Sequence, residues 1–128
     1  MGARILVIED NPDNLELVCY LLRAFGHMPL AAASGRSGID AAVREKPDLI
    51  LCDLQLPDID GYEVARQLRA DPSLNGIRLV AVTAFAMPAD RERVLASGFD
   101  GYIPKPIAPE QFVPQIETFL PAKLRPRL

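Results

Sequence analysis

Residues 5–10, Ile-Leu-Val-Ile-Glu-Asp, decide the fold class, because four apolar residues in a row lead directly into two carboxylates. Two further apolar runs occupy residues 49–52 and 79–82, and the three runs together are rich in β-branched side chains. Continuous runs of this length are typical of strands that are buried on both faces of a sheet. Residues 28–33 and 101–104 are weaker strand candidates.

Five segments with helical periodicity alternate with these strands. They run from a cap at Asn11 to Gly26, over about residues 35–46, from a cap at Asp60 to the residue before Pro72, from Pro88 to Gly98, and through Phe112, Ile116 and Leu120. In the second segment, Ile39 and Val43 are expected to face inward. Pro114 lacks an amide donor, so the last helix either kinks there or starts later than Pro109. The alternation predicts a parallel α/β sheet with helices on both faces.

Composition limits the classes of function. The chain has 128 residues and a mass of 14.0 kDa, with 49% hydrophobic and 24% charged residues, which predicts one soluble globular domain. No apolar run approaches the roughly 20 residues that span a bilayer, so no membrane association is expected. The first 122 residues carry 11 basic and 17 acidic side chains, which argues against nucleic-acid binding. Cys19 and Cys52 lie in apolar runs, which favours buried free thiols and a cytoplasmic location.

The residues that follow the strands carry the candidate chemistry, because ligands of open parallel sheets bind at the carboxyl ends of the strands. These residues are Glu9, Asp10, Asp53, Thr83 and Lys105. Three carboxylates that lie close together repel one another unless a cation joins them, and oxygen ligands suit Mg²⁺. A pair such as Glu9 and Asp10 also fits a helix cap, although Asn11 is the better capping residue.

This set of residues favours phosphoryl chemistry. A carboxylate such as Asp53 can attack phosphorus and form an aspartyl phosphate. The metal, Lys105 and Thr83 would then contact the equatorial oxygens, which carry negative charge in the transition state. Because no glycine-rich phosphate loop is present, nucleotide binding is not expected.

Four motifs together resemble the CheY-like receiver domains of two-component response regulators. They are Glu9-Asp10, residues 53–61 (Asp-Leu-Gln-Leu-Pro-Asp-Ile-Asp-Gly), Thr83-Ala84 and Lys105-Pro106. The resemblance covers about residues 4–120 and implies a doubly wound (βα)₅ flavodoxin-like sandwich, with a parallel five-stranded sheet of order 2-1-3-4-5. We expect a stand-alone receiver over residues 1–122, followed by a short basic tail over residues 123–128.

The resemblance also implies a role for each matching residue. Asp53 would accept a phosphoryl group from a histidine kinase or a histidine phosphotransfer protein. Thr83 and Tyr102 would form the switch, and the Lys105–Pro106 bond would be cis. The protein would be an autocatalytic phosphoacceptor that signals to a downstream protein target, and not an enzyme that turns over an external substrate. The implied Mg²⁺ ligands are Glu9, Asp10, Asp53 and the backbone carbonyl of Gln55.

The first helix carries a second apolar strip of Leu17, Leu21 and Ala24, opposite its buried stripe and beside Asn14. In receiver domains, kinases and phosphotransfer proteins contact the first helix and the loop after the fifth strand. The predicted docking residues are therefore Asn14, Leu17, Leu21, Pro106 and Ile107. Homodimerisation through the same strip is an alternative.

Gln55 and Phe85 occupy the positions that tune dephosphorylation in this family. Gln55 can orient water but is not a base, and Phe85 offers no polar atom, so self-dephosphorylation is expected to be slow. A packing role for Phe85, pointing away from the site, is the alternative. Asp58 and Asp60 are interpreted as a loop residue and a helix cap, and His27 as a solvated turn residue.

Two rival functions remain at the level of sequence. A small phosphatase would also pass through an aspartyl phosphate, but in the dehalogenase-like type a second aspartate stands two residues after the nucleophile. Here that position is Gln55. A receiver-like interaction module that is not phosphorylated usually lacks the aspartate, the lysine or the acidic pair, and this sequence keeps all of them.

Overall fold

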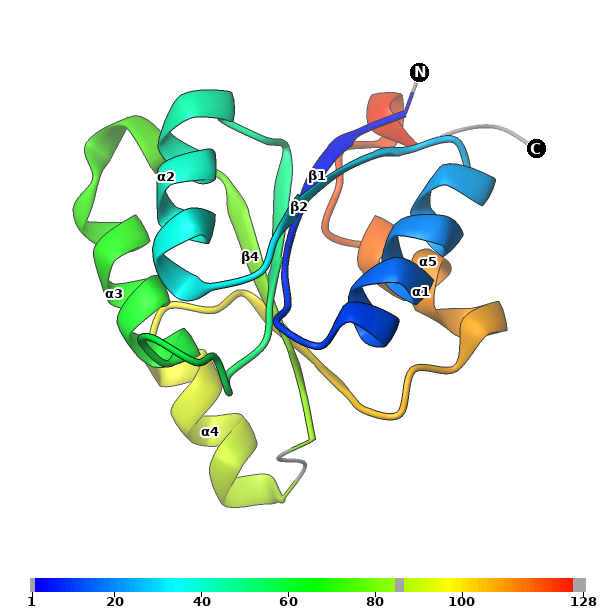
Figure 1. Cartoon of the computed structure of the whole chain (residues 1–128). Coiled ribbons are helices and arrows are strands. Elements are labelled where there is room, and N and C mark those ends of the chain that lie inside the picture. The colour runs from blue at the N-terminus through cyan, green and yellow to red at the C-terminus, as the bar shows by residue number, and fades with distance from the viewer. Residues whose placement is uncertain (1, 85–86, 126–128) are drawn as a thin grey trace.

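Five strands form where the three apolar runs and the two weaker candidates predict them, in a computed structural model that describes residues 2–84 and 87–125 (Figure 1). All neighbouring strands are parallel, and the order is β2-β1-β3-β4-β5, which confirms the predicted doubly wound fold. β2 is an edge strand and contains Pro29, a residue that sheets tolerate at their edges. The strands are β1 (Arg4–Ile8), β2 (Met28–Ala32), β3 (Leu49–Cys52), β4 (Arg78–Thr83) and β5 (Gly101–Pro104).

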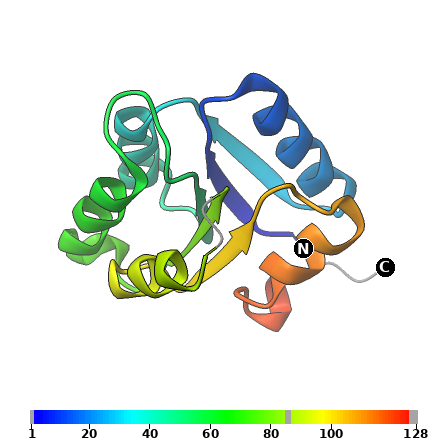
Figure 2. The same ribbon diagram turned by 90° about the horizontal axis from the view of Figure 1, so that it is seen from below.

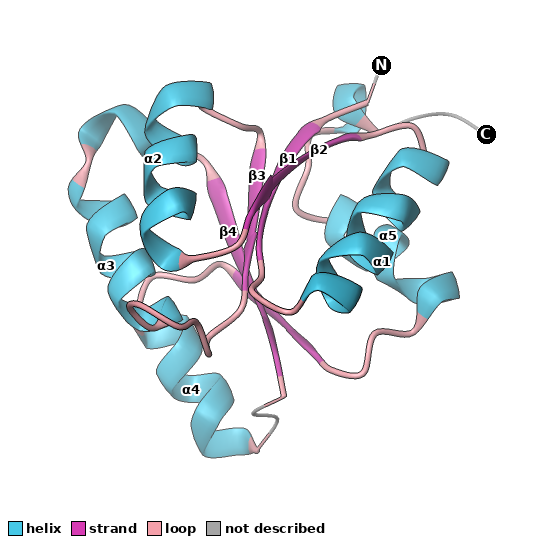
Figure 3. Ribbon diagram, in the orientation of Figure 1, coloured by secondary structure: helices cyan, strands magenta, loops and turns pink. Residues whose placement is uncertain are grey.

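Among the described residues, five α-helices cover the sheet, two on one face and three on the other (Figure 3). α1 (Pro12–Ala24) and α5 (Pro109–Glu117) lie on one side, and α2 (Gly35–Glu45), α3 (Gly61–Ala70) and α4 (Pro88–Ala96) lie on the other. Short 3₁₀ helices occupy Pro72–Leu74 and Ala122–Leu124. Within residues 2–84 and 87–125, none of the helices has both the length and the apolar character needed to cross a membrane.

Two of the predicted helix caps form as expected. The Asn11 side chain accepts hydrogen bonds from the backbone amides of Asp13 and Asn14, at 3.0 and 3.1 Å. The Asp60 side chain accepts one from the Glu63 amide at 2.9 Å. These contacts satisfy amides that have no partner within the first turn of a helix, so they fix where α1 and α3 begin.

The fifth helix does not start later than Pro109, so that alternative for Pro114 is wrong. α5 begins at Pro109 and continues through Pro114 to Glu117. The carbonyl that an amide at position 114 would have bonded belongs to Glu110, and both residues are exposed, so water can replace that hydrogen bond. Phe112 and Ile116 are fully buried and hold the helix against the sheet.

The sheet separates two hydrophobic cores because successive side chains of a strand point to opposite faces. Ile5 and Val7 of β1 pack with α1 and α5, whereas Leu6 and Ile8 pack with α2, α3 and α4. The other strands alternate in the same way. The polar residues that follow the strands at the carboxyl edge are therefore held by strands that pack against apolar side chains on both faces.

The inward-facing side of α2 differs from the prediction. Val43 is 45% exposed, and the buried positions of α2 are Gly35, Gly38, Ala41 and Ala42. A Cβ atom at Gly38 would lie 2.5 Å from Cδ1 of Ile8. The helix backbone approaches β1 so closely that small residues face the sheet and the larger Val43 turns toward solvent, while Ile39 packs partly buried against the core.

His27 is buried, so its prediction as a solvated turn residue is wrong. Its Nδ1 accepts a hydrogen bond from the Ala3 amide at 3.0 Å, which places the ring proton on Nε2, 2.7 Å from Oε2 of Glu117. The histidine side chain is fully enclosed. It therefore links β1, the start of β2 and the end of α5 at the amino edge of the sheet.

We expect His27→Ala to lower the free energy of unfolding by about 1–3 kcal/mol, because it leaves the buried Ala3 amide without an acceptor. Urea denaturation would measure this. Met28→Ala is the matched control, since Met28 is exposed and its removal should cost less than about 0.5 kcal/mol. Equal unfolding free energies for the two variants would contradict the role of His27.

Both cysteines are buried free thiols, as the sequence predicts, and we expect both to be unreactive in the folded protein. Burial raises the pKa of Cys52 far above its usual value, and the nearby carboxylate of Asp53 adds to the rise. Burial also raises the pKa of Cys19. Because the thiolate is the reactive form, a disulfide exchange reagent at pH 8 should label neither thiol until denaturant is added. Labelling of either thiol under native conditions would contradict this.

Candidate functional site

The carboxyl edge of the sheet, which faces the viewer in Figure 2, gathers the candidate residues. Glu9, Asp53 and Lys105 each follow a strand directly, and their backbone amides donate to carbonyls of the neighbouring strands at 3.0, 3.0 and 2.8 Å. The sheet hydrogen bonding thus extends beyond the strand ends. As a result, three residues from distant parts of the sequence are held by the same rigid framework.

Lys105 joins two of the carboxylates. Its Nζ donates to Oε1 of Glu9 at 2.7 Å and to Oδ2 of Asp53 at 2.9 Å. Glu9 and Asp53 are both buried, and Lys105 is half-buried. The Lys105–Pro106 bond is cis, as the resemblance implies. The three side chains thus meet at the edge of the sheet where their positions at strand ends predict them.

The pKa values of Glu9 and Lys105 shift in the directions that burial and hydrogen bonding require. Burial raises the pKa of Glu9, and the hydrogen bond from Lys105 opposes part of the rise. Burial alone would lower the pKa of Lys105, but the hydrogen bonds to Glu9 and Asp53 outweigh it and the pKa is raised. The ammonium is therefore charged at neutral pH and compensates two carboxylates.

Asp10 completes an acidic cluster with these two carboxylates. One oxygen from each of Glu9, Asp10 and Asp53 lies within 4.8 Å of the others, and Asp10 is exposed at the opening of the site. The alternative of a Glu9–Asp10 helix cap is not favoured, because the Asn11 side chain caps α1, while the Glu9 carboxylate accepts the Asn11 amide at 3.2 Å and the Lys105 ammonium at 2.7 Å. The oxygen donor set and the excess of negative charge fit a hard divalent cation such as Mg²⁺.

Thr83 and Tyr102 lie on the two neighbouring strands β4 and β5. Thr83 ends β4 and is fully buried. Tyr102 is half-buried and packs against the core on the α2, α3 and α4 side. Partial burial raises the pKa of Tyr102, and the negative charge of Asp90 on α4 adds to this rise. The Tyr102 ring is thus near α4 as well as β5.

The loop between β3 and α3 carries Gln55 and one residue whose contacts the sequence did not reveal. Gln55 is exposed, and its amide donates to Oδ1 of Asp53 at 3.1 Å. Asp58, interpreted from sequence as a simple loop residue, accepts hydrogen bonds from the amides of Gly35 and Arg36 at the start of α2. These donors lie more than 20 residues earlier in the chain, so no local pattern indicates them. Phe85 lies outside the described residues.

The predicted docking strip is only partly exposed. Leu21 is buried in the core, which corrects its assignment as a docking residue, because α5 packs beside α1 and widens the buried face of that helix. Leu17 is exposed. A groove of about 380 Å³ remains between α1 and the loop after β5, and it is lined by Asn14, Leu17, Ala84, Lys105, Pro106 and Ile107.

Known proteins share both the sequence and the architecture. A curated relative, the polar-differentiation response regulator DivK of Brucella ovis, is 40% identical over 120 residues, which cover 94% of this chain and 98% of DivK. The chemotaxis response regulator CheY4 of Vibrio cholerae has the same fold, with a TM-score of 0.89 at 23% identity over 94% of this chain and 100% of CheY4.

A third comparison concerns the site itself. The receiver domain of a sensor histidine kinase of Pseudomonas aeruginosa is 33% identical, with a TM-score of 0.85 over 93% of this chain and 98% of that domain, and its structure has a magnesium ion coordinated in the active-site cleft. Residues 5–117 of the present chain match the family model of the response regulator receiver domain, while the predicted boundary at residue 122 stays a prediction. The chain belongs to the family of response regulator receiver domains, the signalling modules of two-component systems.

Proposed function

We propose that this chain is a phosphoacceptor response regulator in which Asp53 receives a phosphoryl group from a histidine kinase or a histidine phosphotransfer protein. The observation that carries the proposal is the Lys105 ammonium, held 2.9 Å from Asp53 and 2.7 Å from Glu9 at the carboxyl edge of the sheet. A cation in this position can contact both the attacking carboxylate and the oxygens of an incoming phosphoryl group.

Mg²⁺ is the cation that the rest of the site would hold. Glu9, Asp10 and Asp53 supply carboxylate oxygens within 4.8 Å of one another, and the Gln55 carbonyl is the proposed backbone ligand. The magnesium site of the Pseudomonas receiver domain, at 33% identity, supports this assignment. Bound there, Mg²⁺ would neutralise charge on the transferring phosphoryl group.

The transfer itself is a displacement at phosphorus. A carboxylate oxygen of Asp53 attacks the phosphorus of a phosphohistidine on the donor protein, and the O–P bond forms as the P–N bond breaks. The imidazole nitrogen keeps the electron pair of the broken bond and takes up a proton from water. Lys105 and the Thr83 hydroxyl then stabilise the phosphoryl oxygens.

Signalling would follow from the change of charge at Asp53. Its charge of about −1 becomes about −2 on phosphorylation, so Thr83 and Lys105 gain a stronger acceptor. Among the described residues of α4, only Val94 is buried, which makes this helix the easiest to displace. We propose that Thr83 moves toward the phosphoryl group, that Tyr102 turns inward, and that the face of α4, β5 and α5 changes for a downstream protein.

The groove beside α1 is the proposed docking place for the phosphoryl donor. It is bordered by Asn14 and Leu17 on α1 and by Pro106 and Ile107 after β5, and it opens next to Lys105. A partner helix seated there would place its histidine at the carboxyl edge. Homodimerisation through Leu17 competes with this use of the surface.

We further propose that the protein does not turn over an external substrate. Gln55 stands where a dehalogenase-like phosphatase has a second aspartate, so a general acid is lacking at this position. Gln55 can orient a water molecule without deprotonating it, which favours slow self-dephosphorylation. The acidic pair, Asp53 and Lys105 are all in place, which does not favour an interaction module without phosphorylation.

Intact-mass measurement after incubation with Mg²⁺ and acetyl phosphate tests the proposed function. We expect the wild type to gain the mass of one phosphoryl group and Asp53→Asn to gain none. A gain in both proteins, or in neither, would refute Asp53 as the phosphoacceptor. Continuous release of phosphate from small phosphoesters would instead favour the phosphatase.

The variant Lys105→Met separates the two electrostatic roles of the site. Three carboxylates and one ammonium give a formal charge of −2, and removal of the ammonium leaves −3. We expect Mg²⁺ to bind roughly tenfold more tightly, because the site becomes more negative. Phosphorylation by acetyl phosphate should slow by at least about 100-fold, because a donor to the phosphoryl oxygens is lost. Weaker Mg²⁺ binding together with an unchanged rate would contradict this assignment.

A further inference from the structure

The loop between β3 and α3 must hold its shape for the proposed site to work, because it contains the Gln55 carbonyl. Two hydrogen bonds shape the loop from within. The Gln55 amide donates to Oδ1 of Asp53 at 3.1 Å, and the Gly61 amide donates to the Leu54 carbonyl at 2.9 Å. Between these two bonds Leu56 and Ile59 pack partly buried against the core, whereas Pro57 and Asp58 are exposed and lie at the tip of the loop. The position of this tip depends on a contact outside the loop.

Asp58 provides that contact. Its Oδ1 accepts from the Gly35 amide and its Oδ2 accepts from the Arg36 amide, both at 2.8 Å. Gly35 and Arg36 are the first two residues of α2, whose amides have no partner within the helix. A carboxylate that uses both oxygens at the positive end of a helix makes strong, charge-assisted hydrogen bonds.

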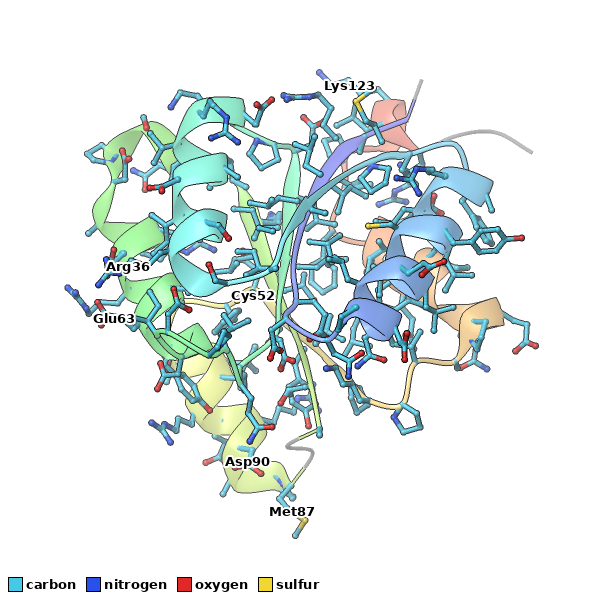
Figure 4. The ribbon with its side chains drawn as sticks, in the orientation of Figure 1. Arg36, Cys52, Glu63, Met87, Asp90 and Lys123 are labelled. Carbon is cyan, nitrogen blue, oxygen red and sulfur yellow. The ribbon has the colours of Figure 1, made fainter. Side chains whose placement is uncertain are left out.

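The contact is tightened by close packing. A Cβ atom at Gly35 would lie 2.5 Å from Cγ1 of Ile59, so the first residue of α2 rests directly on the loop. Ser34, the N-cap of α2, accepts the Ser37 amide at 3.1 Å and leaves the first two amides to Asp58. Figure 4 shows Arg36 beside Glu63 of α3, so α2 and α3 both begin at the edge that bears the site.

The hydrogen bonds from α2 to Asp58 also persist over the physiological pH range, because the carboxyl group stays ionised there. The Arg36 amide is the main cause that lowers the pKa of Asp58 to about 2; burial opposes it, and the Gly35 and Ile59 amides lower the pKa further. A carboxyl group whose pKa falls on folding stabilises the fold at pH values above its unfolded pKa, near 4. That contribution is lost only as the pH falls from about 4 through 2.

We propose that Asp58 is a positioning residue for the phosphorylation site. By fixing the β3–α3 loop to the first turn of α2, it would keep the Gln55 carbonyl in position to serve as a ligand of Mg²⁺. The inference rests on the proposed function, because it concerns the same metal site. Groups that orient metal ligands without touching the metal typically change its affinity by 10- to 100-fold when they are removed.

The test compares Asp58→Ala with two matched variants. Ser34→Ala removes the other partner of the α2 N-terminus without touching the loop. Asp60→Ala removes a carboxylate from the same loop that caps α3 and does not reach α2. The first control measures the effect of a weaker α2, and the second measures the loss of one negative charge near the site. Asp58 is exposed, so its variant should fold.

Two measurements are made on all four proteins. A titration with MgCl₂, followed by backbone amide chemical shifts, gives the Mg²⁺ dissociation constant. We expect Asp58→Ala to raise it by about tenfold or more, and each control to change it by less than about threefold. Amide hydrogen exchange of residues 55–60 in metal-free protein should accelerate in Asp58→Ala alone.

The outcomes separate this inference from the proposed function. If the wild type binds Mg²⁺ but Asp58→Ala binds it equally well, Asp58 only caps α2 and the inference is overturned. Equal weakening by Ser34→Ala or Asp60→Ala overturns it too, since helix stability or charge then explains the effect. If the wild type binds no Mg²⁺, the proposed function fails, and unchanged exchange in the loop of Asp58→Ala would independently overturn the anchoring role.

Discussion

The Lys105 ammonium between Glu9 and Asp53 is the interaction on which the functional edge depends. Two buried carboxylates this close repel each other and are poorly solvated, so they need a cation that stays charged. Lys105 meets this need at 2.7 and 2.9 Å, and the same hydrogen bonds raise its own pKa. Only an arrangement that brings the ends of β1, β3 and β5 to one edge can supply all three groups.

The sheet order provides that arrangement. β1 and β3 are neighbours, so Glu9 and Asp53 leave the sheet side by side, and β4 separates them from β5. Lys105 has the long side chain that this separation requires, whereas Thr83 ends the intervening strand and needs only a short one. The apolar cores on both faces of the sheet hold these strand ends in register, which keeps the charged groups at fixed distances.

Structural features that depend on residues adjacent in the sequence are predictable from it, whereas features that depend on tertiary contacts are not. The strands and the caps at Asn11 and Asp60 are local, and the strand ends located the site. The local sequence predicts a solvated His27, because the partners that bury it, Ala3 and Glu117, lie 24 and 90 residues away.

The corrected helix positions have the same origin. Val43 faces solvent because glycine and alanine allow α2 to approach β1, and Leu21 is buried because α5 widens the core beside α1. Neither contact is visible in the periodicity of one helix. The hydrogen bonds between Asp58 and α2 are also tertiary contacts, since the sequence around a loop carboxylate does not indicate which helix it contacts.

The contrast between tightly packed strands and a weakly buried helix explains how one added charge at Asp53 would alter a distant surface in the proposed function. Lys105 serves two carboxylates in the resting protein, so a phosphoryl group on Asp53 competes with Glu9 for its hydrogen bonds. The backbones of the inner strands β1, β3 and β4 are held in place, because both of their faces are packed. Helix α4 can adjust, since Val94 is its single buried residue. Its Arg93 guanidinium lies 4.1 Å from the centre of the Tyr62 ring of α3. A switch of modest free energy must act on an element whose resting position is weakly held, and α4 meets that condition.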